Sequence, residues 1–264
     1  MNKMMVFCAL VQAVVLVSGA SDEDELAMRT EAREWKAPDG GVFRYRWHAP
    51  SVLEEGKVYP LVVLMHGAGE RGTNNVAQLK WGAKPIFDYL ETKGNEFYFV
   101  AGQVPFGKRW VEVDWGLQAH SMPVTPSETM ARQLAFLEEL FHSCPTIDRA
   151  RVYVTGISMG GYGTWDLLCR KPEWFAAAMP VCGGADISQA WRLREIPIWM
   201  FHGDRDVVVP FARSRMMTAA LWACDANVKY TEYPGVAHDS WKLAYGTVAN
   251  LSWLFSQKRI RNQR

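Results

Sequence analysis

Short apolar runs alternate along the chain with segments in which apolar residues recur at helical spacing. Continuous or alternating apolar runs predict strands, and recurrences every three to four residues predict helices. The expected strands are 42–47, 61–65, 97–101, the run from 151 into a glycine cluster, 176–181, 198–201 and 228–233. The expected helices are 76–90, 125–141, the segment after residue 160, 211–223 and 241–255. This order predicts an α/β fold with a mostly parallel central sheet and helices on both faces.

Three segments differ from this regular alternation. Residues 42–47 alternate apolar and basic side chains, which is typical of a half-exposed antiparallel strand at the edge of a sheet. Residues 26–35 are polar, and we expect them to be loosely held. Residues 102–126 show little pattern but contain several aromatic residues; irregular stretches of this length usually act as lids or binding loops.

The composition is that of a globular protein with a sizeable core. Apolar residues make up 49% of the 264 residues, charged residues 22%, and the formal net charge is +1. A near-neutral chain without a basic patch gives no electrostatic reason to expect nucleic acid as a partner. We found no internal repeat and no linker, so residues 21–264 are expected to form one catalytic domain.

The first 20 residues have the pattern of a secretory signal peptide. Lys3 precedes an apolar stretch over residues 4–17, and Ser18-Gly19-Ala20 offers a small-residue cleavage site. A membrane anchor is the alternative, but the apolar stretch is shorter than the roughly 20 residues that span a bilayer. We therefore expect cleavage after Ala20 and a secreted or periplasmic protein without a membrane span.

Four cysteines remain in the mature chain, Cys144, Cys169, Cys182 and Cys224. Export would permit disulfides, and the sequence does not choose among the possible pairings. Cys169 and Cys182 fall in an expected buried helix and strand, where free thiols are equally compatible with the pattern.

A serine stands at the centre of the glycine cluster. Residues 156–160 read GISMG and fit G-x-S-x-G, the nucleophile-elbow signature of α/β-hydrolases. In that elbow the serine sits on a sharp strand-to-helix turn, and side chains two residues away on either side would collide with backbone. Such a pentapeptide arises by chance in about one chain in ten of this composition. The strand expected before it and the helix expected after it make Ser158 the predicted nucleophile rather than an ordinary turn serine.

A serine nucleophile needs a base, and the base needs an orienting carboxylate. Asp206 and His238 each follow an expected strand, and their order after Ser158 is that of nucleophile, acid and histidine in α/β-hydrolases. Asp204 lies nearer its strand, where we expect it to brace the turn. Asp239 adjoins His238 and is expected to point elsewhere.

Other histidines compete for the role of base. His66 and His202 each precede a glycine at a strand end, where we expect them to hydrogen-bond locally and hold a loop. His142 falls on a helix surface, and His120 in the 102–126 loop is either solvated or in contact with substrate.

Acyl transfer also needs N–H donors aimed at the developing oxyanion. The N–H of Met159, directly after the nucleophile, is one candidate. The second is expected in the glycine-rich loop after strand 61–65, from Ala68 or alternatively Gly69. Glu70 and Arg71 in the same loop are expected to brace it, with substrate contact as the alternative.

Several segments together resemble the secreted esterases of the α/β-hydrolase superfamily. They read HGAGERGTNN, AGQVP followed by Trp110, GISMGGYGTW, HGDRDVVVP and GVAHDSW, and the resemblance as a whole covers residues 61 to about 253. They are most similar to the phospholipase/carboxylesterase-like "predicted peptidase" group, which is related to feruloyl and acetylxylan esterases and to dienelactone hydrolases. The chain differs from similar members at Gly102, where they usually have proline, and keeps Gln103.

The resemblance implies a role for each candidate residue. Ser158 would be the nucleophile, Asp206 the acid and His238 the base, with Ala68 and Met159 forming the oxyanion hole.

Substrate contacts are predicted at three positions. Trp110 and Trp241 lie nearest the expected site in sequence, whereas Trp81 and Trp165 are further candidates. Because the chain has 12 tryptophans, most of them must pack in the core. Gln103 is the third predicted contact.

The sequence therefore predicts a secreted serine hydrolase that cleaves carboxylic esters without metal or cofactor. Feruloyl or acetyl esters of plant polysaccharides are the expected substrates, on the basis of the resemblance and of export. The alternatives are a serine peptidase acting on small peptides and a non-catalytic binding protein on the same scaffold.

Overall fold

The computed structural model describes residues 21–259, so the predicted signal peptide at 1–20 lies outside the described residues. The strands are β1 (Glu31–Lys36), β2 (Val42–His48), β3 (Tyr59–Met65), β4 (Tyr98–Gln103), β5 (Ile147–Ile157), β6 (Ala177–Val181), β7 (Ile198–Gly203) and β8 (Val228–Tyr233). The α-helices are α1 (Asp22–Arg29), α2 (Ala83–Thr92), α3 (Glu128–Ser143), α4 (Met159–Arg170), α5 (Ala212–Trp222), α6 (Trp241–Gly246) and α7 (Val248–Ser256). Short 3-10 helices lie at η1 (Ala68–Glu70), η2 (Ala77–Leu79), η3 (Pro172–Trp174) and η4 (Ile187–Leu193).

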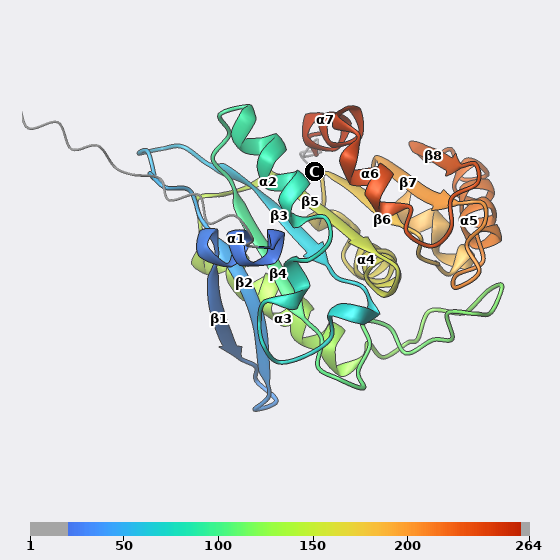
Figure 1. Cartoon of the computed structure of the whole chain (residues 1–264), viewed down its shortest axis with the longest axis horizontal. Coiled ribbons are helices and arrows are strands. Elements are labelled where there is room, and N and C mark those ends of the chain that lie inside the picture. The colour runs from blue at the N-terminus through green and yellow to red at the C-terminus, as the bar shows by residue number, and fades with distance from the viewer. Residues whose placement is uncertain (1–20, 260–264) are drawn as a thin grey trace, which may run out of the picture.

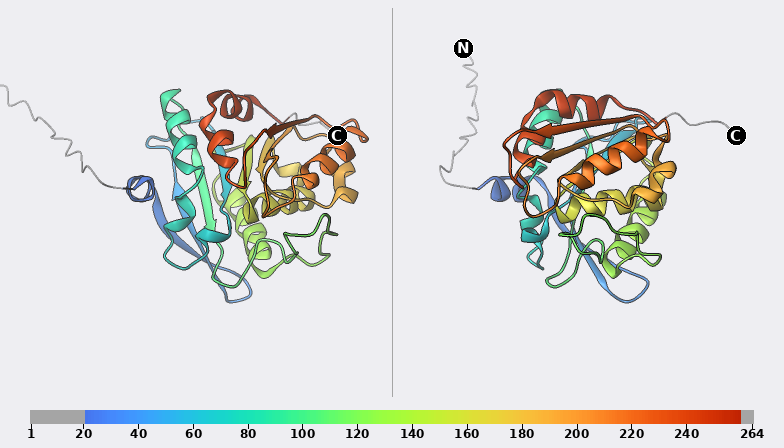
Figure 2. Two further views of the ribbon diagram at one scale, coloured as in Figure 1. Left: turned by 45° about the vertical axis from the view of Figure 1, so that its right-hand side comes forward. Right: turned by 90° about the vertical axis from the view of Figure 1, so that its right-hand side faces the viewer.

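All eight strands join one sheet in the order β1-β2-β4-β3-β5-β6-β7-β8. Strands β3 to β8 are parallel to one another, and β2 pairs antiparallel with both β1 and β4. Helices α1, α2, α6 and α7 pack on one face of the sheet, and α3, α4 and α5 on the other (Figures 1 and 2). The predicted α/β fold with a mostly parallel sheet is confirmed.

Strand β3 shows why the central strands are apolar without interruption. Leu61, Val63 and Met65 point into the core under α3, α4 and α5, whereas Val62 and Leu64 point into the core under α2 and α7. Since both faces of a parallel sheet are covered, every side chain along such a strand is buried.

The N-terminal segment is more ordered than its polar sequence suggests. The prediction that residues 26–35 are loosely held is wrong, because they form the second half of α1 and most of β1. Ser21 caps α1 through a reciprocal capping box with Asp24, and Leu26 inserts into the core with no exposed surface. Strand β1 is nearly all exposed and is held by its backbone ladder with β2, so it leaves no hydrophobic signal in the sequence.

The predicted edge position of residues 42–47 is also wrong. Strand β2 is antiparallel as expected, but it lies between β1 and β4. One of its basic residues, Arg46, is therefore buried and donates hydrogen bonds to the carbonyl oxygens of Asn75, Thr30 and Ala27. Its guanidinium group donates to buried backbone carbonyl groups instead of facing water.

Two predicted helices are each divided in the structure. The helix expected over 76–90 is a 3-10 turn followed by α2, with a break at Gly82. Gly82 has φ +85°, and a side chain there would meet the ring of Tyr245. The helix expected over 241–255 is α6 followed by α7, which separate at Thr247.

Among the described residues, Cys144, Cys169, Cys182 and Cys224 are all free thiols. No helix within residues 21–259 combines the length and the apolar character that crossing a membrane requires.

Candidate active site

Ser158 lies on a strained turn between β5 and α4. Its backbone has φ 51° and ψ −118°, a conformation that non-glycine residues rarely adopt. Gly156 and Gly160 flank it, and a Cβ on Gly156 would lie 2.5 Å from the carbonyl oxygen of Gly160. A Cβ on Gly160 would clash with the carbonyl of Met65 at the end of β3. The glycines are therefore required by the close approach of three backbone segments.

The structure brings His238 and Asp206 to Ser158 from two other strand ends. The Nε2 atom of His238 is 2.8 Å from the Ser158 hydroxyl, and its Nδ1 atom is 2.7 Å from Oδ2 of Asp206. Since an ionised carboxylate only accepts hydrogen bonds, Nδ1 carries the ring proton and Nε2 presents its lone pair to the hydroxyl. This is the arrangement in which a histidine can take a proton from serine.

Asp206 is buried and held as an anion. Burial opposes its ionisation, but hydrogen bonds from His202, His238 and the backbone N–H of Val209 outweigh that effect and keep its pKa well below the usual range. The carboxylate therefore stays charged beside His238 throughout the neutral pH range.

The neighbouring carboxylates make other contacts, as the sequence predicts. Oδ1 of Asp204 accepts a hydrogen bond from the N–H of Gly235 at 2.7 Å and so braces the turn before His238. Asp239 forms an exposed ion pair with Lys242 at 2.8 Å. Among these three aspartates, Asp206 alone contacts the imidazole.

The two predicted oxyanion donors each begin a helix. Ala68 is the first residue of η1 and Met159 is the first residue of α4. N–H groups in the first turn of a helix have no intrahelical acceptor and can bind an anionic oxygen. Nε of Arg71 donates to the carbonyl oxygen of Ala68 at 2.8 Å, which shows Arg71 bracing this loop as predicted.

His66 holds the start of the same loop in place. The ring is buried; its Nδ1–H donates to the carbonyl of Gly67 at 2.6 Å, and its Nε2 accepts from the N–H of Val104 at 2.9 Å. Burial, together with nearby Arg71, lowers the pKa of His66 to about 4, so that the ring is neutral at neutral pH. The predicted loop-holding role of His66 agrees with these contacts.

Two of the three predicted substrate contacts are buried beneath the site. Trp110 has no exposed surface, and its Nε1–H donates to the carbonyl oxygen of His66. Gln103 is 2% exposed; its amide donates to Glu70 and Asn74, and its carbonyl accepts from the N–H of Asn75. Both predictions are corrected: these side chains hold the loop from below, because their polar atoms are already satisfied by it.

Trp241 is the predicted contact that lies beside His238. Its ring stands edge-on to that of His238, with 5.4 Å between centroids, and it also packs against Trp81 at 5.8 Å. It is partly exposed, unlike Trp110.

The long irregular loop is fastened to the body of the protein. The stretch predicted to be irregular, 102–126, contains neither helix nor strand apart from its first two residues, which end β4. Arg213 of α5 donates to the carbonyls of Leu117 and Asp114 and to Nδ1 of His120, and the Tyr162 hydroxyl donates to the carbonyl of Trp115. Because of these bonds, the loop forms a fixed wall rather than a freely moving lid.

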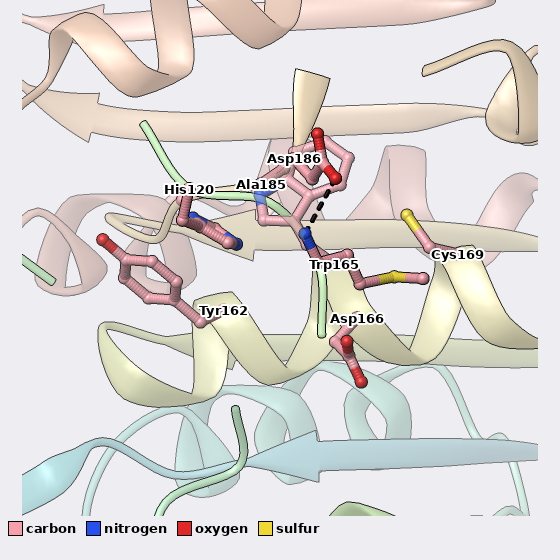
Figure 3. Close-up of a pocket in the computed structure, with 9 residues that line it drawn as sticks. His120, Tyr162, Trp165, Asp166, Cys169, Ala185 and Asp186 are labelled. Atoms are coloured by element: carbon pink, nitrogen blue, oxygen red, sulfur yellow. Dashed lines mark hydrogen bonds between the residues drawn. The ribbon is translucent and has the colours of Figure 1, made fainter. Parts of the chain in front are cut away.

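A small cavity of about 10 Å³ lies between this loop and α4 (Figure 3). His120 lines it from the loop, Tyr162, Trp165 and Cys169 from α4, and Asp186 from the segment after β6, where its carboxylate accepts from the N–H of Met122. Burial and the Arg213 charge lower the pKa of His120 to about 4. A space of this size holds about one water molecule, so it is not a substrate pocket.

One group of possible metal ligands occurs among the described residues. Ligand atoms of Cys182, Asp206 and His238 lie within 4.8 Å of one another. Asp206 and His238 already bond to each other, and burial raises the pKa of the Cys182 thiol, which keeps it protonated. These residues fit a metal ion poorly.

His202 hydrogen-bonds within its own loop, as the sequence predicts, because its Nε2 atom bonds to the carbonyl oxygen of Val209. The sequence does not predict that the same ring also bonds to the Asp206 carboxylate. Its position four residues before Asp206 at the end of a strand is the signal that could have indicated this contact.

Comparisons with known proteins show which family the chain resembles. The family model described as Phospholipase/Carboxylesterase matches residues 50–251. A search of curated proteins finds no match. A solved thermostable esterase is similar with 35% identity and a TM-score of 0.81, over 88% of this chain and 64% of that chain. This chain therefore spans less than two thirds of that esterase.

More distant solved structures share the fold alone. An acylaminoacyl peptidase from Pyrococcus horikoshii has 17% identity and a TM-score of 0.65, over 91% of this chain and 44% of that one. A ferulic acid esterase has 16% identity and a TM-score of 0.62, over 86% of this chain and 98% of that one. Together, the family match, the sheet order and the serine elbow show that the chain belongs to the phospholipase/carboxylesterase family of α/β-hydrolases.

Proposed function

We propose that the protein is a serine carboxylic-ester hydrolase in which Ser158, His238 and Asp206 act as a catalytic triad. The continuous hydrogen-bond chain from Asp206 through His238 to Ser158 is the observation that carries the proposal. Family membership and the similarity to a thermostable esterase support ester hydrolysis as the reaction.

The geometry supports an acyl-enzyme mechanism. Oγ of Ser158 attacks the acyl carbon while its proton passes to Nε2 of His238. The carbonyl oxygen becomes an oxyanion and accepts from the N–H groups of Ala68 and Met159. His238 then gives its proton to the leaving alcohol. Water repeats the sequence in the second half-reaction, releasing the acid and restoring the serine hydroxyl.

The ionised Asp206 stabilises the imidazolium form of His238 in both half-reactions, since the positive charge develops 2.7 Å from its carboxylate oxygen. It takes no proton itself. Because both donors proposed for the oxyanion are backbone groups, the hole depends on loop shape rather than on a side chain.

We propose feruloyl or acetyl esters of plant polysaccharides as substrates. The resemblance to feruloyl and acetylxylan esterases supports this class, as does the signal peptide expected at residues 1–20, which would deliver the enzyme outside the cytoplasm. Trp241 supplies an aromatic surface next to the base, where part of such a substrate could pack.

Burst kinetics with p-nitrophenyl acetate test the proposal. The wild-type protein should release p-nitrophenol in a burst and then turn over, and Ser158→Ala should abolish both. Ser143→Ala, an exposed serine at the end of α3, is the matched control and should behave as the wild type. A wild type without Ser158-dependent release would reject ester hydrolysis and leave the non-catalytic binding protein.

Matched ester and amide substrates distinguish an esterase from a peptidase. An acyl p-nitrophenyl ester should be cleaved with a higher kcat/KM than the corresponding p-nitroanilide. Faster cleavage of the anilide would favour the peptidase alternative. A series from acetyl through feruloyl to long acyl esters then tests the proposed substrate class.

A further inference from the structure

His202 lies at the end of β7 with no exposed surface, and both of its ring nitrogens are hydrogen-bonded. Its Nε2 atom is 3.1 Å from Oδ2 of Asp206 and 3.1 Å from the carbonyl oxygen of Val209. Its Nδ1 atom is 2.8 Å from the hydroxyl of Ser214, a buried residue in the first turn of α5.

These partners determine which ring nitrogen carries the proton. A carboxylate and a backbone carbonyl can only accept hydrogen bonds, so Nε2 must be the donor. Nδ1 then presents a lone pair to Ser214, whose hydroxyl donates to it. The Ser214 hydroxyl therefore favours the tautomer in which His202 donates to the acid.

The Asp206 carboxylate is fully occupied by four donors. Oδ1 accepts from the N–H groups of Val208 and Val209, each at 2.9 Å, and Oδ2 accepts from His238 and His202. Because a carboxylate offers about four acceptor sites, none is left over. His202 is the one side chain besides His238 among these donors, and it shares the very oxygen that faces the base.

We propose that His202 is a positioning residue for the catalytic acid: its Nε2–H holds Oδ2 of Asp206 in line with His238, and Ser214 holds the His202 ring. The inference rests on the proposed function, since it assigns His202 a role through the triad acid. Loss of the donor would let the carboxylate rotate about its bond to Cβ and would leave a buried oxygen one partner short. His238 would then be misaligned with Ser158 while substrate binding is unchanged.

Two amide substitutions separate the donor from the rest of the side chain. In His202→Gln the terminal nitrogen can occupy the place of Nε2 and still donate to Asp206, but the bond to Ser214 is lost. In His202→Asn the shorter amide reaches only the place of Nδ1, which keeps the Ser214 partner and loses the donor to Asp206. The two variants are otherwise alike in polarity and in the absence of a ring.

We expect kcat for a p-nitrophenyl ester to fall by about 10- to 100-fold in His202→Asn, the range for loss of a hydrogen bond to a charged group. His202→Gln should stay within about threefold of the wild type, and KM should change little in both. Ser214→Ala, a smaller change, should lower kcat by only a few fold. If His202→Asn turned over as fast as His202→Gln, or if both changed KM instead of kcat, the positioning role would be rejected.

Nitrogen NMR of the wild-type protein labelled with [15N]histidine gives a readout that needs neither turnover nor a folded variant. The signals of His202 should show a protonated Nε2 and an unprotonated Nδ1 at neutral pH. An unprotonated Nε2 would overturn the inference. If turnover depended on Ser158 but His202→Asn and His202→Gln had equal kcat values, this inference alone would be rejected. A wild type without Ser158-dependent turnover would instead reject the proposed function.

Discussion

Two turns of this protein begin with the same dipeptide, His66-Gly67 directly after β3 and His202-Gly203 at the end of β7. Both histidines are buried, with 2% or less of their surface exposed, and both use their two ring nitrogens. The glycines also serve alike, because a Cβ on Gly67 would press on Glu70 and one on Gly203 would clash with the carbonyl of Val236. The turns differ in what the rings bind.

The ring of His66 bonds to backbone groups, the carbonyl of Gly67 and the N–H of Val104, and so fixes the shape of the loop that follows β3. The ring of His202 bonds to the carboxylate of Asp206 and so acts on a charge. A histidine at a strand end can therefore stabilise either a backbone path or an ionised side chain, and the dipeptide does not distinguish the two. Substitutions in the first turn should therefore mainly lower stability, whereas substitutions in the second turn should mainly lower kcat.

The largest effect is expected at the carboxylate in the second turn. Asp206→Asn should lower kcat by about 10³- to 10⁴-fold, because an amide donor facing Nδ1 favours the wrong tautomer of His238. Asp204→Asn is the matched control in the same turn, and its activity should stay within a few fold since Asp204 accepts only from Gly235. Steady-state hydrolysis of a p-nitrophenyl ester measures both. A larger loss at Asp204 would show that the acid is misassigned.

The first turn should show its effect in stability instead, and in a defined pH range. The pKa of His66 falls from 6.5 to about 4 in the folded protein, chiefly through burial. Between those two pH values the unfolded chain binds a proton that the native chain does not, so the free energy of unfolding decreases as pH falls. The full contribution of His66 to that decrease is about 3 kcal/mol, because a tenfold difference in proton affinity corresponds to about 1.4 kcal/mol. His120, whose pKa is also about 4, acts in the same direction.

Urea unfolding at several pH values between 4 and 7 measures this dependence, with His66→Gln as the matched variant. The glutamine can still accept from the N–H of Val104 but cannot titrate, so its pH dependence should be flatter than that of the wild type. Its stability at pH 7 should fall by about 1 kcal/mol for the lost bond to Gly67. Equal slopes in both proteins would show that His66 does not cause the acid sensitivity.

The features that could be predicted from the sequence are the strands with a clear hydrophobic pattern and the candidate residues whose order along the chain is typical of the fold. The central strands are apolar throughout because both faces are covered, and Ser158, Asp206 and His238 each stand after a strand in the order that the fold requires. Strand β1 was missed because its exposed polar residues are held by backbone pairing, which has no residue preference strong enough to read.

Roles that depend on partners could not be predicted in the same way. Trp110 and Gln103 are predicted to contact substrate because they lie near the site in sequence, but both are buried under the loop that they hold. His202 is predicted to bond locally, and it does so at Asp206 and Val209, but its choice of Asp206 as a partner depends on the turn that places residue 206 back over the ring. Such assignments need the distance between side chains, which the sequence does not contain.

The smallest effect tests the corrected position of Trp110, whose Nε1–H donates to the carbonyl of His66 at 3.1 Å. Trp110→Phe removes that bond and part of a buried ring, which should lower the free energy of unfolding by about 1–2 kcal/mol. KM should stay within about twofold for both acetyl and feruloyl esters, because no surface of Trp110 is exposed to substrate. Trp241→Phe is the counterpart variant. Because the ring of Trp241 lies against His238, the main effect of this substitution should be on KM for the feruloyl ester rather than on the free energy of unfolding. If Trp110→Phe raised KM for the aromatic ester and left the free energy of unfolding unchanged, Trp110 would line the substrate site after all. The turn at His66 would then contribute to substrate binding as well as to the backbone structure.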